Sequence, residues 1–480
     1  PDYSSAASDV YKRQMLSLPP EMQSALEQHR QAHVVQFWGE LGDDQRAALL
    51  GDLESLDLAL LQRLYEQPEE AVDWHAMAAR AEPPTAIRVS DLEDEGRVAK
   101  ARELGETSLK NGEVAVVIVA GGQGTRLGFS KPKGLYPIGP LSERTLFQVL
   151  FDNVKAKAHR YGKPIPILLM TSPLTHDETL AYLEAQDYLG YDREHVRLFC
   201  QGTMAALDEE TGKLLLDAKH RLALSPDGHG GMVSALDRSG TLQYLKDLGI
   251  KSLYYCQIDN PLAQVASPEL LGFHQLRESE LTTQVVHKVG PLERVGNVVE
   301  VDGQLQIIEY SDLPEEAAHQ VNDSGGLKLW AGNIAIHVFN LDFLDRVKAS
   351  VQALPFHTAH KKVPFISGDG QRIEPETPNG LKYERFIFDL LPEAKNALAV
   401  ESEKRLSFAP VKNAPGAASD TPELAQQAMS DHAKAMLEAV GVDCSQAGVI
   451  EIHPSFAMDV DELRQRLDDT SPIVGDRYFV

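Results

Sequence analysis

The sequence contains few cysteines and no long apolar run. Its three cysteines, Cys200, Cys256 and Cys444, lie far apart, and neither their odd number nor their spacing fits a disulfide framework or a zinc site. We therefore expect the chain to work in a reducing compartment, the cytoplasm. No stretch approaches the roughly eighteen consecutive apolar residues that a membrane-spanning helix needs, so we expect no contact with the membrane interior.

Positive charge is also scarce. The chain has 46 Lys and Arg against 71 Asp and Glu, which gives a formal net charge of −25. Such an acidic body argues against nucleic acid or an anionic membrane as a partner. At 480 residues the chain is long enough for two or three domains with ample core. A local cluster of cations on this acidic background is therefore a candidate site.

The chain divides by pattern into four consecutive parts. Residues 1–14 lack a starting methionine and an apolar signal core, so we interpret them as a non-native leader before Met15. Residues 15–103 have helical periodicity and no glycine loop, which predicts an N-terminal helical domain. Strand, loop and helix patterns alternate in residues 104–400, the expected catalytic domain. Residues 401–480 form a smaller C-terminal domain.

The alternation in residues 104–400 predicts an α/β fold with a mixed, mainly parallel Rossmann-like sheet covered by helices. Residues 354–372 read as irregular. We expect ligands beyond the carboxyl ends of the strands. Strands are expected at 114–120, 165–170, 196–199, 252–257, 282–287, 296–301, 305–309, 332–338 and 449–452, and helices at 145–161, 176–189, 231–248, 269–278 and 422–440.

A glycine-rich loop follows the first predicted strand. The run Gly121-Gly122-Gln123-Gly124-Thr125-Arg126-Leu127-Gly128 comes directly after it, and Lys131-Pro132-Lys133 comes next. Glycines let backbone N–H groups approach a bulky anion, and Arg126, Lys131 and Lys133 add positive charge. The last glycine falls one place late for a dinucleotide fingerprint, and the Gly-Lys-[Ser/Thr] of an ATPase loop is missing. The loop therefore predicts a different kind of phosphate site.

The whole string resembles the signature loop of the UDP-sugar pyrophosphorylases, most closely that of the UDP-N-acetylhexosamine pyrophosphorylases. Further motifs of that family follow in its order from about Leu26 to beyond Lys412. The resemblance implies a nucleotidyltransferase in which Lys133 contacts the α-phosphate of UTP and Arg126 contacts the β- and γ-phosphates. It also implies nucleotide binding by the loop residues Gly121, Gly122, Gly124 and Thr125.

Asp259 follows the predicted strand 252–257. A carboxylate at a strand end is normally a helix cap or a metal ligand. The resemblance implies that it binds Mg²⁺ (or Mn²⁺) bridging the phosphates, and one carboxylate with phosphate oxygens and water fits the way Mg²⁺ is held. His357 and His360 lack a third ligand at suitable spacing, so we do not expect a metal there.

Two further motifs resemble the uracil-binding elements of the family. Uracil needs a partner that can both donate and accept hydrogen bonds, which Gln201 and the backbone at Gly228 can supply. His229 stands where the family often has Asn, so its role beside the uracil or ribose is open.

The sugar side is also implied by resemblance. Gly296, Glu309 and Asn333 match family positions that hold the hexose, although Glu309 taken alone could equally be a solvated polar residue on a strand. Lys382 and Lys412 lie in family motifs and are expected to bind the sugar phosphate. The family commonly has Ser-Pro-Leu-Lys-Asn-Ala around the second lysine, so Ala409 and Val411 are mild departures.

The resemblance therefore implies a uridylyltransferase that joins UTP and an N-acetylhexosamine-1-phosphate, with a UDP-sugar and pyrophosphate as products. N-acetylglucosamine is the expected sugar. A UDP-glucose or broad UDP-sugar pyrophosphorylase is the nearest alternative, and a non-catalytic UDP-sugar-binding regulator is another. A glycosyltransferase is disfavoured because no Asp-x-Asp metal motif stands in the required loops.

Overall fold

The computed structural model of the chain describes residues 18–67, 72–93, 95–348 and 354–480. The predicted leader at residues 1–14 lies outside them. The chain folds into two compact units, each built from separate stretches of the sequence. The described residues within 1–72, 201–231 and 354–387 form unit 1, and those within 73–200, 232–353 and 388–480 form unit 2. The predicted domain borders at 103 and 400 stay predictions.

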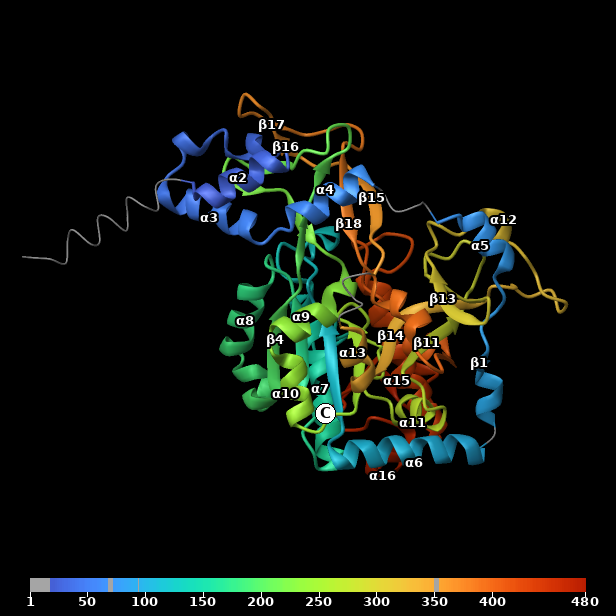
Figure 1. Cartoon of the computed structure of the whole chain (residues 1–480). Helices are drawn as coiled ribbons and strands as arrows, with labels where there is room; N and C mark the ends of the chain where they lie inside the picture. Colours follow the sequence, from blue (N-terminus) through green and yellow to red (C-terminus); the bar gives the residue numbers. More distant parts are fainter. Residues whose placement is uncertain (1–17, 68–71, 94, 349–353) are drawn as a thin grey trace, which may run out of the picture. The chain divides into compact units, whose positions relative to one another are not determined.

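Unit 2 is built on a large mixed sheet, which confirms the predicted fold class (Figure 1). The strand order is β1-β19-β11-β14-β10-β2-β3-β4, with the hairpin β12–β13 joined to β14. Pairing is parallel except where β14 meets β10, β11 and β12, and within the hairpin. The strands are β1 (Ala86–Ile87), β2 (Val114–Val119), β3 (Ile167–Thr171), β4 (Val196–Cys200), β10 (Ser252–Gln257), β11 (Leu281–His287), β12 (Asn297–Val301), β13 (Gln304–Ile308), β14 (Ala331–Asn340) and β19 (Leu398–Ser402).

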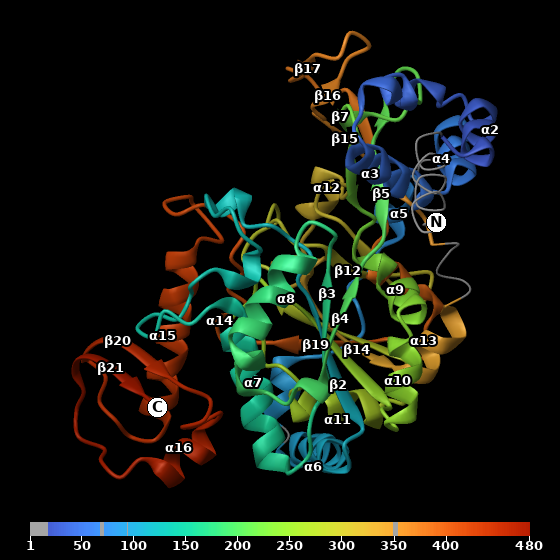
Figure 2. The same cartoon turned by 90° about the vertical axis from the view of Figure 1, so that its left-hand side faces the viewer.

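Helices flank this sheet within unit 2 (Figure 2). Side chains of β2 and β3 share a core with apolar residues of α7 and α11, such as Phe147 and Phe273. The Thr145 side chain caps α7 by accepting a hydrogen bond from the backbone N–H of Gln148. In return, the Gln148 side chain accepts a hydrogen bond from the backbone N–H of Thr145. The helices are α5 (Trp74–Arg80), α6 (Glu95–Asn111), α7 (Leu146–Tyr161), α8 (His176–Ala185), α9 (Met232–Arg238), α10 (Thr241–Asp247), α11 (Pro268–Leu276), α12 (Glu315–Ala318) and α13 (Leu341–Val347).

Helices α6 and α11 lie side by side and approach closely through two glycines (Figures 1 and 2). A Cβ on Gly105 would lie 1.9 Å from the carbonyl oxygen of Pro268, and a Cβ on Gly272 would lie 1.7 Å from that of Ala101. Any side chain at either position would therefore force the two backbones apart.

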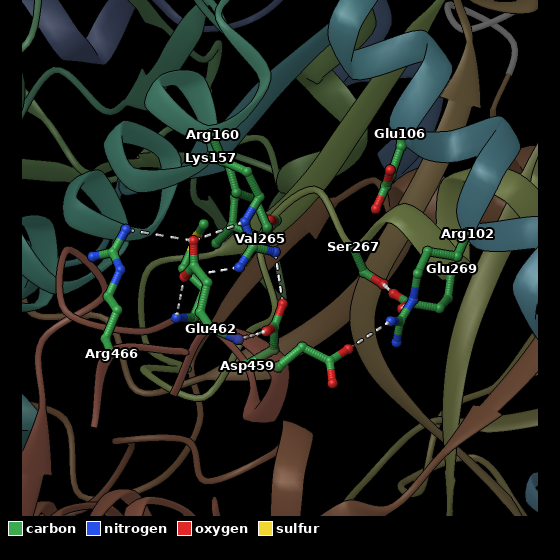
Figure 3. A network of polar contacts seen from close by, with 12 residues as sticks. Arg102, Glu106, Lys157, Arg160, Val265, Ser267, Glu269, Asp459, Glu462 and Arg466 are labelled. Atoms are coloured by element: carbon green, nitrogen blue, oxygen red, sulfur yellow. Dashed lines mark hydrogen bonds and ion pairs between the residues drawn. The ribbon is translucent and has the colours of Figure 1, made fainter. Parts of the chain in front are cut away.

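The last part of unit 2 has its own small core, which includes Leu437, Ile450 and Leu463. Polar contacts attach it to α7, where Arg160 pairs with Asp459 at 2.6 Å and with Glu462 at 2.8 Å (Figure 3). A further ion pair attaches it to α6, where Arg102 lies 3.6 Å from Asp461. A cavity of about 360 Å³ lies among these segments, and no predicted site residue lines it. The elements are α14 (Lys404–Ser407), α15 (Pro422–Ala439), β20 (Gln446–Ile452), α16 (Val460–Arg466) and β21 (Val474–Phe479).

Lys157 is a buried cation beside this network (Figure 3). Its Nζ donates a hydrogen bond to the carbonyl oxygen of Val265 at 2.6 Å. Burial lowers the pKa of its ammonium group to about 8, although Glu269 acts in the opposite direction. The unfolded chain should bind this proton up to a pKa near 10.5. Between these two pH values the unfolded state binds more protons, so the free energy of unfolding should rise with pH.

We therefore expect Lys157→Met to remove this rise. Between pH 7.5 and pH 10.5, the free energy of unfolding of the wild type should rise relative to that of the variant by up to about 3 kcal/mol. Urea unfolding of both proteins across that range would measure it, and titrations common to both cancel in the difference. Parallel curves would show that Lys157 keeps an ordinary pKa.

Unit 1 assembles three separate stretches of the chain around one core. Leu49 and Leu61 from the N-terminal helices pack with Leu214 and Tyr383 from the other two stretches. Its helices are α2 (Pro20–Gln28), α3 (Asp43–Glu54) and α4 (Leu58–Glu66). Its strands are β5 (Thr203–Ala205), β6 (Leu207–Asp208), β7 (Leu216–Ala218), β8 (Arg221–Leu222), β9 (Leu224–Pro226), β15 (His357–Lys361), β16 (Phe365–Ile366), β17 (Arg372–Ile373) and β18 (Gly380–Glu384).

Three local predictions were wrong. Residues 231–248 form two helices, because Gly240 adopts a left-handed φ of 71° between α9 and α10. The helix from His176 ends at Ala185, and residues 187–189 take positive φ angles. Residues 354–372, expected to be irregular, contain β15, which gains regular hydrogen bonds by pairing with β18.

Among the described residues, no helix is both long and apolar enough to cross a membrane.

Candidate active site

The glycine-rich loop in unit 2 folds back on itself after β2. The Gly124 N–H donates to the Lys131 carbonyl at 2.9 Å, and the Lys133 N–H donates to the Gly122 carbonyl at 3.1 Å. Ser172, after β3, donates its hydroxyl hydrogen to the Gly121 carbonyl at 2.7 Å. Lys133 is thereby returned to the base of the loop, while Thr125 and Arg126 stay exposed in a 3₁₀ turn.

Lys133 and Asp259 face each other at the carboxyl ends of two paired strands. Strand β2 leads into the glycine-rich loop, and its parallel neighbour β10 leads into Asp259. The Lys133 Nζ lies 3.5 Å from the Asp259 Oδ2, and both side chains are mostly buried. The pairing confirms the predicted position of Asp259 just beyond a strand, and it brings a cation and a carboxylate together at the carboxyl ends of β2 and β10.

A clamp holds the Lys412 segment against Asp259. The Val411 N–H donates to the Asp259 carbonyl at 2.8 Å. The Asn260 side chain accepts from the Ala409 N–H at 3.1 Å and donates to the Ser407 carbonyl at 2.8 Å. Two segments almost 150 residues apart in the sequence are thus joined by three hydrogen bonds. Asn260 was not among the predicted site residues, although it stands directly beside Asp259.

Asp420 is a second carboxylate in this region that sequence analysis missed. Its carbonyl accepts hydrogen bonds from the Lys412 N–H at 2.8 Å and the Asn413 N–H at 3.0 Å. Burial raises the pKa of its carboxyl group, Lys412 opposes that shift, and Asp259 adds to it. Lys412 and Asp259 therefore both lie within electrostatic range of Asp420.

The three predicted hexose residues lie together in unit 2. The Asn333 N–H donates to the Gly296 carbonyl at 2.8 Å. A Cβ on Gly296 would lie 2.8 Å from the Glu309 Oε1, so the carboxylate packs against bare backbone. Asn333 holds a local irregularity in β14 by accepting a hydrogen bond from the Ala335 N–H at 3.0 Å, where Ala335 has a φ of 55°. The irregularity coincides with a register shift against β11.

The predicted uracil residues and Lys382 belong to unit 1. Gly228 has a φ of 85°, and a Cβ there would lie 2.3 Å from the Arg385 carbonyl oxygen, so this turn requires glycine. His229 accepts a hydrogen bond at Nδ1 from the Ile387 N–H at 3.1 Å, and burial lowers its pKa to about 4. The imidazole is therefore neutral and keeps its proton on Nε2. Gln201 is buried, and Lys382 lies on β18.

The carboxylate of Asp259 suits a hard divalent cation. A carboxylate oxygen is a ligand that Mg²⁺ accepts, together with phosphate oxygens and water. No group of three His, Cys, Asp or Glu side chains with metal-binding geometry occurs in the described part of the chain. His360 instead contacts Glu209 at 2.8 Å, and His357 packs on Phe386 with ring centroids 4.4 Å apart.

Known proteins match almost the whole chain. The sequence profile of the family described as UTP–glucose-1-phosphate uridylyltransferase matches residues 58–475. The chain belongs to this family. This membership confirms the resemblance to the UDP-sugar pyrophosphorylases, because relatives within the family carry such names.

Three relatives of this uridylyltransferase family show how far the similarity extends. The chain is 35% identical to UDP-N-acetylhexosamine pyrophosphorylase-like protein 1 of Mus musculus, over 87% of this chain and 85% of that protein. It is 33% identical to the UDP-N-acetylglucosamine pyrophosphorylase of Saccharomyces cerevisiae, over 92% of this chain and 97% of that protein. The crystal structure of the Trypanosoma brucei UDP-N-acetylglucosamine pyrophosphorylase, in complex with an inhibitor, matches 96% of this chain and 99% of that chain. Its TM-score is 0.81 and its identity 26%.

Proposed function

We propose that this chain is a uridylyltransferase that joins UTP and N-acetylglucosamine-1-phosphate to give UDP-N-acetylglucosamine and pyrophosphate. The observation that carries the proposal is the approach of Lys133 to Asp259, with Lys412 held nearby by the clamp. In the reaction, a phosphate oxygen of the sugar phosphate attacks the α-phosphorus of UTP. The bond from that phosphorus to the bridging oxygen breaks, and pyrophosphate leaves with its electron pair.

Such a reaction needs little proton transfer, so the protein must hold two polyanions in line and neutralise their charge. Lys133 is proposed to bind the α-phosphate and Arg126 the β- and γ-phosphates, with backbone N–H groups of the glycine-rich loop around them. Lys412 and Lys382 bind the sugar phosphate. Asp259 would hold Mg²⁺ or Mn²⁺, which supplies further positive charge to the phosphate oxygens when bound.

The remaining predicted residues account for substrate recognition. Gln201 and the backbone at Gly228 pair with the uracil, and the neutral His229 offers one N–H donor beside it or the ribose. Gly296, Glu309 and Asn333 hold the hexose, and their mutual contacts support that assignment. The cytoplasmic location remains part of this proposal.

A panel of sugar-1-phosphates tests enzyme, nucleotide and sugar together. Pyrophosphate release with UTP and Mg²⁺ is measured for N-acetylglucosamine-1-phosphate, N-acetylgalactosamine-1-phosphate and glucose-1-phosphate. We expect the N-acetylglucosamine compound to give the highest kcat/KM. A site that hydrogen-bonds a substrate group typically rejects an analogue without that group by about 10⁴-fold, so the preference over glucose-1-phosphate should be large.

The description of the family favours a second candidate, a UDP-glucose pyrophosphorylase. Equal or better use of glucose-1-phosphate would establish that candidate and contradict ours. Absence of pyrophosphate release with every sugar phosphate would instead favour a UDP-sugar-binding regulator, and binding of UDP-N-acetylglucosamine by calorimetry would then test that role.

A further inference from the structure

An ion pair outside the predicted residues joins two segments of the proposed sugar-phosphate site. The Glu293 Oε1 pairs with the Lys404 Nζ, and the two side chains are 14% and 29% exposed. The other carboxylate oxygen of Glu293 accepts a hydrogen bond from the Val289 N–H at 2.7 Å. The Glu293 side chain therefore stabilises its own loop through one oxygen and binds a distant lysine through the other.

Each partner is directly connected to one subsite. Glu293 lies in the loop between β11 and β12 that leads into Gly296, and its carbonyl accepts a hydrogen bond from the Val295 N–H at 2.9 Å. Lys404 begins α14, whose last residue, Ser407, accepts the hydrogen bond from Asn260. The pair thus connects the loop of the hexose residues to the segment that carries Lys412.

Other charged side chains of the candidate site lie close to this ion pair. Asp420 is within electrostatic range of Lys412, Asp259, Lys404 and Glu293. Glu293 also acts on Lys288, a buried lysine whose Nζ donates to the Asn297 side chain. The ion pair therefore lies among the residues proposed to bind the sugar phosphate and the metal.

A sugar-1-phosphate is short, with only one bond between the anomeric carbon and the phosphate oxygen. Its hexose and phosphate subsites must therefore stay at a fixed separation, because a small misplacement in such a site can cost about 10²-fold in rate. We propose that the Glu293–Lys404 pair is a latch that fixes this separation, which makes both residues positioning residues for the sugar-1-phosphate. The inference rests on the proposed function.

The test is a double-mutant cycle with Glu293→Gln and Lys404→Met. The glutamine keeps an oxygen for the Val289 N–H, so only the charge pair is lost. Each single variant should raise the KM for N-acetylglucosamine-1-phosphate about tenfold and leave the KM for UTP within about twofold. The double variant should be no worse than either single one, because both changes break the same interaction. Lys404→Arg should keep both KM values near those of the wild type.

A matched pair in the same unit serves as the control. Lys246 and Asp345 form an ion pair at 2.7 Å in which the lysine is 31% exposed, close to the value for Lys404, and Lys246→Met should change neither KM. Unchanged KM values in Glu293→Gln, equal increases for both substrates, or multiplying effects in the double variant would each overturn the latch. If the wild type turns over its substrate normally, such a result leaves the proposed function intact. A wild type without turnover overturns the proposed function and the latch with it.

Discussion

Replacing Lys133 with alanine is expected to lower kcat for UDP-N-acetylglucosamine synthesis by about 10²–10³-fold, the usual loss when one preorganised electrostatic donor is removed. The Lys133 Nζ lies 3.5 Å from the Asp259 Oδ2, at the point where the strand-end loops of β2 and β10 meet. In the proposed arrangement, the variant would lack the ammonium group that balances negative charge developing on the α-phosphate oxygens of UTP. The hydrogen bond from the residue 133 N–H to the Gly122 carbonyl does not involve the side chain, so the loop should keep its shape.

Lys131→Ala is the matched control. Lys131 belongs to the same loop and carries the same charge, but its side chain is exposed and its carbonyl accepts the bond from Gly124. Its replacement should change kcat by less than about threefold, which is roughly the weakening expected from a screened surface charge. Pyrophosphate release at saturating UTP and sugar phosphate measures both variants. Equal losses in the two would mean that the net charge of the loop matters and not the position of Lys133.

Gly272→Ala should destabilise the fold by about 2–3 kcal/mol, because it adds volume where the surroundings cannot yield. The new Cβ would lie 1.7 Å from the Ala101 carbonyl oxygen and 2.3 Å from its carbonyl carbon. Both are backbone atoms of α6, so no rotamer change in a neighbour can relieve the overlap. The helices would have to separate, and the core between α11 and the sheet would loosen with them.

Gly51→Ala, also within a helix, is expected to stabilise the protein. Gly51 lies in α3, and nothing lies within 4 Å of a Cβ placed there. Alanine is a better helix former than glycine, so this variant should be more stable by about 0.5–1 kcal/mol. Urea unfolding of both variants beside the wild type gives the two free energies. A stable Gly272→Ala protein would show that α6 and α11 can move apart at low cost.

The sequence predicted the elements that local pattern determines. The apolar run of β2 is buried almost throughout, and β10 has the predicted bounds, so the exits of both strands were located in advance. That Lys133 and Asp259 form an ion pair was not predicted, because it depends on the parallel pairing of β2 with β10 that the structure shows. The hexose residues were identified by resemblance, and their mutual contacts were found in the structure.

Contacts between distant segments could not be predicted. Nothing near Asn260 indicates that it binds the backbone of residues 407–409, and nothing near Glu293 indicates Lys404. The core of unit 1 draws Leu49, Leu214 and Tyr383 from three stretches, so no local periodicity marks its extent. The break at Gly240 is a local signal, but a single glycine inside a helical pattern is common enough that its left-handed turn was missed.

The clamp between Asn260 and the Lys412 segment has a consequence for the order in which the protein becomes active. A growing chain that has emerged as far as residue 300 already contains the glycine-rich loop, Lys133 and Asp259. It still lacks the backbone that Asn260 binds, as well as strand β19 between β1 and β11. Nascent or prematurely terminated chains of this length thus contain the glycine-rich loop and Asp259 without the segment that the clamp holds, and the candidate site can be complete only after residue 412 has been synthesised.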